Sequence, residues 1–116
     1  MPDLGLVVRA VPYRQRSART QLDVALAAGV LELELEIYFV HASIYQLVEG
    51  KDPSAAQLPP GMRGWNALVN MTDVRFYAEI DWLNEISPSR LSVPVTGLVL
   101  PEMRKRWGGC QRVLGL

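Results

Sequence analysis

Apolar residues recur along the chain in two patterns, one typical of helices and one typical of strands. After Ser17, which is well placed to cap a helix, apolar or small residues follow at positions 22, 25, 26, 29 and 30, the spacing of one helix face. Residues 4–11 are mostly apolar and end at Pro12, and residues 37–40 are apolar without interruption. A continuous run is expected in a strand that helices cover on both faces. The pattern therefore predicts alternating strands and helices.

The rest of the chain continues this alternation. Further strands are predicted at residues 73–80, 93–100 and 110–114, and further short helices at 42–49, 62–71, 81–85 and 101–107. Residues 51–61 and 87–90 are predicted to be loops, because proline, glycine and serine interrupt both patterns there.

Strands that alternate with helices favour right-handed crossovers and a mostly parallel sheet with helices on both faces. We therefore predict an α/β fold, with three layers and a flavodoxin-like, five-stranded, mostly parallel sheet in the order 2-1-3-4-5. With 116 residues, 49% of them hydrophobic, the chain is expected to form a single domain over residues 1–116.

The zero net charge of the chain is unevenly distributed. Residues 1–20 and 102–112 each carry a net charge of +3, whereas residues 21–101 carry −6. This division suits contact between copies or subunits, whereas a nucleic-acid-binding domain is expected to be basic overall. We therefore expect no direct binding of nucleic acid.

The expected location is the cytoplasm. The single cysteine, Cys110, has no partner for an internal disulfide, so nothing marks an oxidising compartment. The first residues lack the basic start of a signal peptide, and no uncharged run is long enough to span a bilayer.

The predicted sheet suggests where a ligand or a partner would bind. In open α/β sheets this place is the edge formed by the carboxyl ends of the strands. The candidate residues at that edge are Tyr13, Arg14, His41, Ser43 and Glu79. Arg14, together with Arg16 and Arg19, could also hold an anion at a helix start, but a solvated basic loop is favoured because no glycine-rich phosphate loop is present.

Two residues could carry chemistry. His41 could act as a general base, although a structural histidine at a strand end is the favoured interpretation. Cys110 lies near Arg106 and Arg112, which would favour its thiolate and a persulfide-carrying role. It also starts the last strand, at the edge opposite the expected site, where a buried structural cysteine is the favoured alternative. No metal site is expected, since one histidine and one cysteine have no paired ligand spacing, and no cofactor is expected.

Two segments carry a family resemblance. Residues 37–53, IYFVHASIYQLVEGKDP, resemble the second strand and following helix of the DsrE/DsrF-like sulfur-relay family, in particular its TusC (DsrF) type of subunit. Residues 9–29, RAVPYRQRSARTQLDVALAAG, are similar to the family's proline turn and the helix after it. At the strand-two turn, where the family usually has Gly-Asp-Gly, this chain has His41-Ala42-Ser43.

The resemblance implies a subunit of a homo-oligomer, or of a hetero-oligomer with DsrE/TusD-like and DsrH/TusB-like chains, that serves tRNA thiolation or sulfur oxidation. In TusD-type subunits the sulfur-carrying cysteine lies just past the third strand, which corresponds to Glu79 or a neighbour here. The leading hypothesis is therefore a non-catalytic accessory subunit. The alternatives are a sulfurtransferase that uses Cys110 and a small-molecule binding module at the edge near His41.

Overall fold

Residues 2–9, 16–48 and 64–115 are described in the computed structural model of the chain. The strands are β1 (Leu4–Val8), β2 (Leu35–Phe39), β3 (Val74–Glu79), β4 (Thr96–Leu98) and β5 (Arg112–Gly115). The α-helices are α1 (Arg16–Val30), α2 (Ile80–Leu83) and α3 (Leu100–Gly108), and the 3-10 helices are η1 (His41–Leu47), η3 (Gly64–Asn70) and η4 (Pro88–Arg90).

The five strands form one sheet in which every pair of neighbours is parallel, which confirms the α/β prediction. The strand order is β4-β3-β2-β1-β5, so the predicted order 2-1-3-4-5 is wrong. The prediction placed β2 at an edge of the sheet. In the structure β2 lies between β1 and β3, and all five of its residues are buried.

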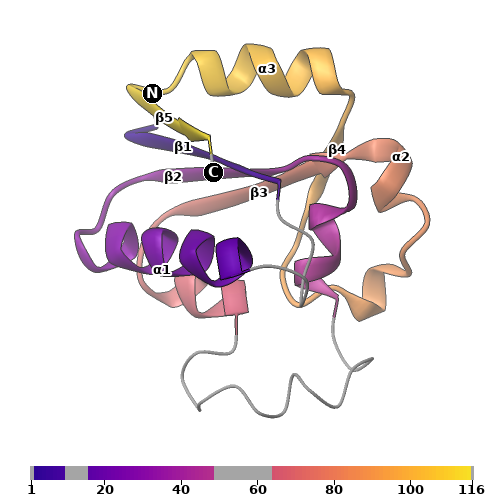
Figure 1. Ribbon diagram of the computed structural model, residues 1–116, viewed down its shortest axis with the longest axis horizontal. Helices are drawn as coiled ribbons and strands as arrows, with labels where there is room; N and C mark the ends of the chain where they lie inside the picture. The colour runs from indigo at the N-terminus through magenta and orange to yellow at the C-terminus, as the bar shows by residue number, and fades with distance from the viewer. Residues whose placement is uncertain (1, 10–15, 49–63, 116) are drawn as a thin grey trace.

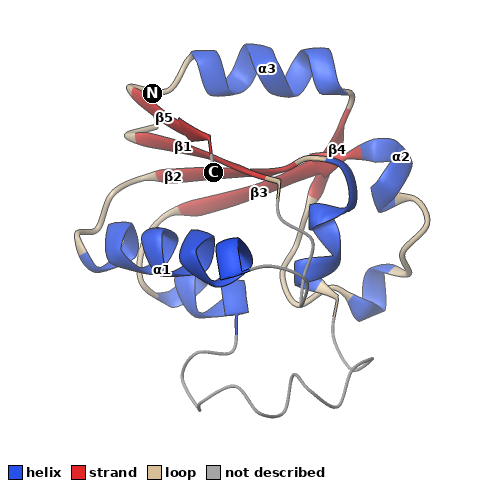
Figure 2. Cartoon of the chain, viewed as in Figure 1, coloured by secondary structure: helices blue, strands red, loops and turns tan. Residues whose placement is uncertain are grey.

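The order explains how the helices are distributed over the two faces (Figure 1). From β1 to β4 the chain moves across the sheet in one direction, so right-handed crossovers place α1, η1 and η3 on the same face. The last crossover returns from β4 to β5 at the opposite edge, which places α3 alone on the other face. The result is a three-layer arrangement with one well-covered face and one covered by a single helix (Figure 2).

The larger core lies between the sheet and α1, η1 and η3. It includes Leu6, Ile37 and Phe39 from the strands and Trp65 from η3, whose indole packs edge-on against Phe39. The smaller core lies under α3 and is formed by Tyr38, Tyr77 and Met103, with Leu98, Leu100 and Trp107 packed against them.

Some predicted elements differ in extent or type. The predicted strand 93–100 is reduced to β4, because Pro94 has no N–H to donate and pairing with β3 begins only at Thr96. The predicted helix 42–49 is the 3-10 helix η1, and η4 occupies most of the predicted loop 87–90. Helix α1 begins at Arg16, so Ser17 lies in its first turn and not at the cap. None of the helices in the described ranges is long and apolar enough to cross a membrane.

Candidate functional site

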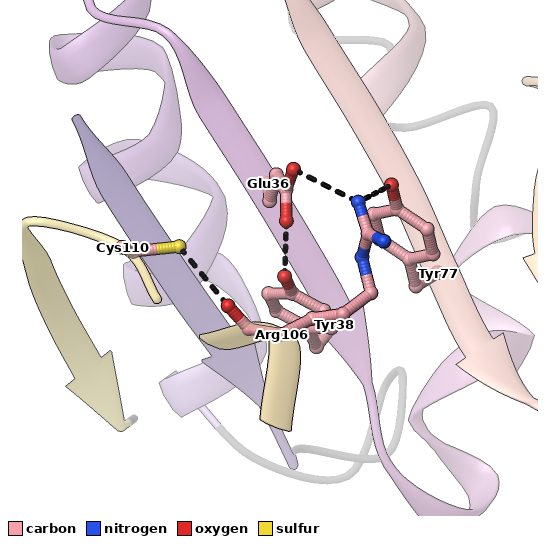
Figure 3. Close-up of polar contacts among 5 residues, drawn as sticks. All are labelled: Glu36, Tyr38, Tyr77, Arg106 and Cys110. Carbon is pink, nitrogen blue, oxygen red and sulfur yellow. Dashed lines mark hydrogen bonds and ion pairs between the residues drawn. The ribbon is translucent and has the colours of Figure 1, made fainter. Parts of the chain in front are cut away.

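A cluster of polar side chains lies between the sheet and α3. Alternation along β2 directs Glu36 and Tyr38 to the face that α3 covers, and the strand register brings Tyr77 of β3 directly beside Tyr38. Helix α3 contributes Arg106 to the same space, and Cys110 follows that helix (Figure 3). The cluster thus joins β2, β3 and α3.

The members of this cluster satisfy one another. The Tyr38 hydroxyl donates a hydrogen bond to Glu36, whose second carboxylate oxygen lies 3.4 Å from Nη2 of Arg106. The same guanidinium nitrogen donates to the Tyr77 hydroxyl at 2.8 Å, and the guanidinium carbon lies 4.8 Å from the centre of the Tyr77 ring. Tyr38 and Tyr77 stack with their ring centres 5.2 Å apart. Because Glu36 is only 6% exposed, these partners replace the water that its carboxylate has lost.

Cys110 is buried next to this cluster, at the amino edge of the sheet. Its Sγ lies 3.8 Å from the backbone oxygen of Arg106, to which the thiol donates a weak hydrogen bond. A side chain at Gly5 of β1 would place its Cβ 2.9 Å from Sγ, so a larger residue there would displace the thiol. Burial raises the pKa of Cys110, and the Glu36 charge raises it further. Arg106 lowers the pKa of Cys110, in the predicted direction, but burial and the Glu36 charge outweigh it, so the thiolate is not favoured overall.

The cluster is suited to holding α3 on the sheet. Burial also raises the pKa of Tyr38, and its hydrogen bond to Glu36 adds to the effect, so the phenol keeps its proton at neutral pH. A protonated phenol, a protonated thiol and a carboxylate bound to an arginine offer neither a base nor a nucleophile. Within the described part of the chain, no three His, Cys, Asp or Glu residues lie close enough together to hold a metal ion.

The carboxyl edge of the sheet holds the second group of candidate residues. Nδ1 of His41 lies 3.1 Å from Oε2 of Glu79, and the His41 backbone N–H donates to the same oxygen. The histidine side chain is 67% exposed, whereas that of Glu79 is 15% exposed. His41 has a φ of 54°, in the left-handed region that favours glycine. The sequence therefore placed these two residues at the same edge, and the structure brings them into contact.

The other predicted residues of this edge are separate from that pair. Ser43 is fully buried, and its hydroxyl lies 2.8 Å from the backbone oxygen of Val8 and 2.7 Å from that of Val40. It therefore ties η1 to the end of β1 and is not available to a ligand. Tyr13 and Arg14 lie outside the described residues. So do the side chains of Arg16 and Arg19.

Sequence reasoning missed the cluster under α3. In the sequence Glu36 is the last of three glutamates, after Glu32 and Glu34, that alternate with leucines before the apolar run 37–40. One signal was available: Glu36 directly precedes a fully apolar run, and a carboxylate within a strand covered on both faces needs a buried partner. The identity of that partner, 70 positions away in Arg106, depends on the position of α3.

Known proteins place this fold and both groups of residues in context. The chain matches the DsrE/DsrF-like family over residues 3–81, which includes the His41–Glu79 pair as well as Glu36, Tyr38 and Tyr77. No curated protein matches the chain. Among solved structures it is similar to the ychN protein from E. coli, with a TM-score of 0.74, 18% sequence identity and coverage of 100% of both chains. At this identity the likeness shows the fold, and the match to the family decides the affiliation. The chain belongs to the DsrE/DsrF-like family.

Proposed function

We propose that the chain is a TusC (DsrF)-type accessory subunit of a sulfur-relay oligomer and that it does not carry sulfur itself. DsrE/DsrF-like proteins generally work in multi-subunit sulfur-relay complexes. The expected partners are DsrE/TusD-like and DsrH/TusB-like chains. In this role the chain supplies binding surface and shape to the complex, while a partner supplies the reactive thiol.

The observation that carries this proposal is the position of the only cysteine. Cys110 is buried at the amino edge under α3, and its pKa is raised first by burial. At the end of β3, where the resemblance places the carrier cysteine of TusD-type subunits, this chain has Glu79, which binds His41. A sulfur carrier needs an accessible thiolate, and neither edge provides one.

Capture of partners tests the accessory role. The full chain, tagged and expressed in its own host, is expected to co-purify with small DsrE-like and DsrH-like chains at a fixed ratio. Deletion of its gene is expected to lower either tRNA thiolation or sulfur oxidation, and the affected process identifies the pathway. If neither process changes and no such chain co-purifies, the proposed function is wrong.

Mass spectrometry tests the statement that Cys110 does not carry sulfur. The intact chain is incubated with a cysteine desulfurase and its substrate, which would transfer a terminal sulfur to an accessible thiol as a persulfide. We expect no gain of a sulfur atom while the chain is folded. A gain that is absent in Cys110→Ser would instead establish a persulfide-carrying sulfurtransferase.

A second candidate function is a small-molecule binding module at the carboxyl edge. The observation that favours it is the exposed imidazole of His41, which Glu79 holds in place through one ring nitrogen. A thermal-shift screen of metabolites tests this function, with His41→Gln as the comparison. A ligand that stabilises both proteins equally would exclude His41 from the binding site.

A further inference from the structure

Strand β5 is exposed along its whole length. All four of its residues are exposed, including the apolar Val113 at 40% and Leu114 at 42%. The register with β1 directs Val113 to the α3 face and Leu114 to the α1 face, so apolar side chains are uncovered on both sides of this edge. An exposed edge strand with apolar side chains is a template on which another chain can pair.

Arginines stand at both ends of this strand. Arg112 is the first residue of β5 and is exposed, and exposed Arg9 has a guanidinium nitrogen 3.0 Å from the position of a Cβ on Gly115 at the other end. The carboxylate of Asp3, which lies just before β1, accepts a hydrogen bond from the Glu34 backbone N–H. We call Arg9, Arg112, Val113 and Leu114 the basic edge.

A second exposed apolar group lies where α1 and η3 end. Val30 and Leu31 are each 71% exposed, and Val69 is 49% exposed. The two helix ends adjoin, because a Cβ on Gly29 would lie 2.9 Å from a methyl carbon of Leu68.

The residues around this second group are acidic. Glu32, Glu34 and Asp73 are all exposed. Asp73 belongs to the same place, since its backbone oxygen accepts a hydrogen bond from the N–H of Leu35 at the start of β2. We call Val30, Leu31, Val69, Glu32, Glu34 and Asp73 the acidic patch.

The charges decide how two copies can meet. If β5 of one copy paired with β5 of another, antiparallel strands would place Arg112 near Arg9 of the second copy, and parallel strands would place like arginines together. Two acidic patches would repel each other in the same way. The basic edge and the acidic patch, in contrast, are opposite in sign and each has an apolar centre, the arrangement of a specific interface with a charged rim.

We infer that the basic edge of one copy of this chain binds the acidic patch of a second copy. The inference rests on the proposed oligomeric role and specifies which surfaces meet. Because two different surfaces meet, the contact is heterologous, and repetition produces a closed ring or an open chain of copies. The apolar residues exclude water at the centre of the contact, and the charges fix its orientation.

Charge reversal followed by rescue tests this inference on the full chain. One variant carries Glu32→Lys and Glu34→Lys, a second carries Arg9→Glu and Arg112→Glu, and a third combines all four changes. Sedimentation velocity measures their assembly, and circular dichroism verifies that each is folded. The control carries Asp81→Lys and Glu85→Lys, two exposed acidic residues in and after α2. Helix α2 follows the carboxyl end of β3, whereas Asp73 of the acidic patch precedes the amino end of that strand, and β5 lies beyond β2 and β1 in the sheet.

We expect the wild type and the control to associate, and more weakly as salt is added. Each double variant is expected to raise the dissociation constant by about 100-fold, because like charges then face each other. We expect association to return in the variant that carries all four substitutions. We expect the same in an equal mixture of the two double variants.

A monomeric wild type would overturn the inference, as would a control that dissociates like the double variants. Failure of both rescues would overturn it too. Such a protein could still co-purify with DsrE-like and DsrH-like chains, so the capture experiment evaluates the proposed function independently. A double variant that is monomeric but retains those partners would support both statements.

Discussion

At the scale of single residues, His41 combines a strained backbone with a ring contact to the Glu79 carboxylate. A left-handed conformation costs an ordinary side chain about 1–2 kcal/mol relative to the right-handed region. The backbone N–H and the ring of His41 both bind Glu79, which offsets part of that cost. A glycine at this position would avoid the strain but would lose the ring contact. Histidine at this position therefore has an unfavourable backbone conformation, but it places an exposed imidazole at the carboxyl edge.

Two substitutions separate these effects. His41→Ala removes the ring contact with Glu79 and keeps the strain, whereas His41→Gly removes both. We expect the glycine variant to be more stable than the alanine variant by about 1 kcal/mol, because glycine adopts this φ without a steric penalty. Urea unfolding measures the difference. Ala42, which has no positive φ, serves as the control position, and Ala42→Gly is expected to lower stability. A glycine variant at 41 that is no more stable than the alanine variant would contradict the strain argument.

The sequence located His41 and Glu79 at one edge because both lie at the carboxyl ends of predicted strands. It could not indicate that they touch, since this depends on β2 and β3 being neighbours in register. In the predicted order the two strands were separated by β1. The contact is thus a consequence of the strand order and not of local sequence.

At the scale of elements, the buried cluster connects α3 to the middle of the sheet. Arg106 is the only residue of the cluster that α3 contributes, and it contacts both Glu36 of β2 and Tyr77 of β3. Its side chain is 42% exposed, so water weakens the ion pair, whereas the Glu36 side chain is only 8% exposed. Loss of the arginine would therefore affect Glu36 most, because a buried carboxylate without its partner is unfavourable.

A double-mutant cycle measures this connection. We expect Arg106→Ala to lower the free energy of unfolding by about 1–3 kcal/mol, since it leaves Glu36 with only the Tyr38 hydroxyl. In a Glu36→Gln background the same change is expected to cost less, because the carboxylate charge is gone. Arg104→Ala, at an exposed position of the same helix, is the matched control and is expected to change stability by less than about 0.5 kcal/mol. Equal costs of Arg106→Ala in both backgrounds would show that the pair contributes nothing.

The elements themselves were largely predictable, because apolar spacing reflects which faces are buried. Their order in the sheet was not, because the same alternation of strands and helices is compatible with several directions of winding. One residue pattern did argue against the predicted order: an edge strand seldom has the uninterrupted apolar run that precedes His41. That run favours an inner position for β2, which the predicted order 2-1-3-4-5 does not give it.

At the scale of the whole molecule, the direction in which the chain crosses the sheet decides where the polar cluster, Cys110 and the exposed edge strand lie. A single return from β4 to β5 leaves one helix on the second face, where the buried cluster and Cys110 lie, and leaves β5 as an exposed edge. The thiol of Cys110 thereby lies at the amino edge, away from the His41–Glu79 pair at the carboxyl edge. The same return places the basic segment 102–112 at one side of the sheet. The uneven charge along the sequence therefore becomes an uneven charge over the surface.

The buried thiol of Cys110 and the buried phenol of Tyr38 make the stability of the whole fold depend on pH in the alkaline range. The pKa of Cys110 is raised above its ordinary value of 9.0, first by burial, and that of Tyr38 above its ordinary 10.0, also first by burial. Below pH 9 both groups hold their protons in the folded and unfolded chains, so they cause no pH dependence. Above pH 9 the unfolded chain begins to lose the thiol proton while the folded chain keeps it, and above pH 10 the same holds for the phenol. Because the folded chain then binds more protons, its stability falls as the pH rises toward the folded pKa values.

We therefore expect the free energy of unfolding to decline above pH 9, by up to about 1.4 kcal/mol per pH unit for each group that has begun to ionise in the unfolded chain. Urea unfolding at a series of alkaline pH values measures the decline, and differences between variants isolate each group from the other titrating residues. Cys110→Ala is expected to flatten the curve between pH 9 and 10, whereas Tyr38→Phe is expected to flatten it only above pH 10. Curves that stay parallel to that of the wild type would mean that the thiol and the phenol ionise as readily in the folded chain as in the unfolded one. In that case the raised pKa would no longer argue against a sulfur-carrying role for Cys110.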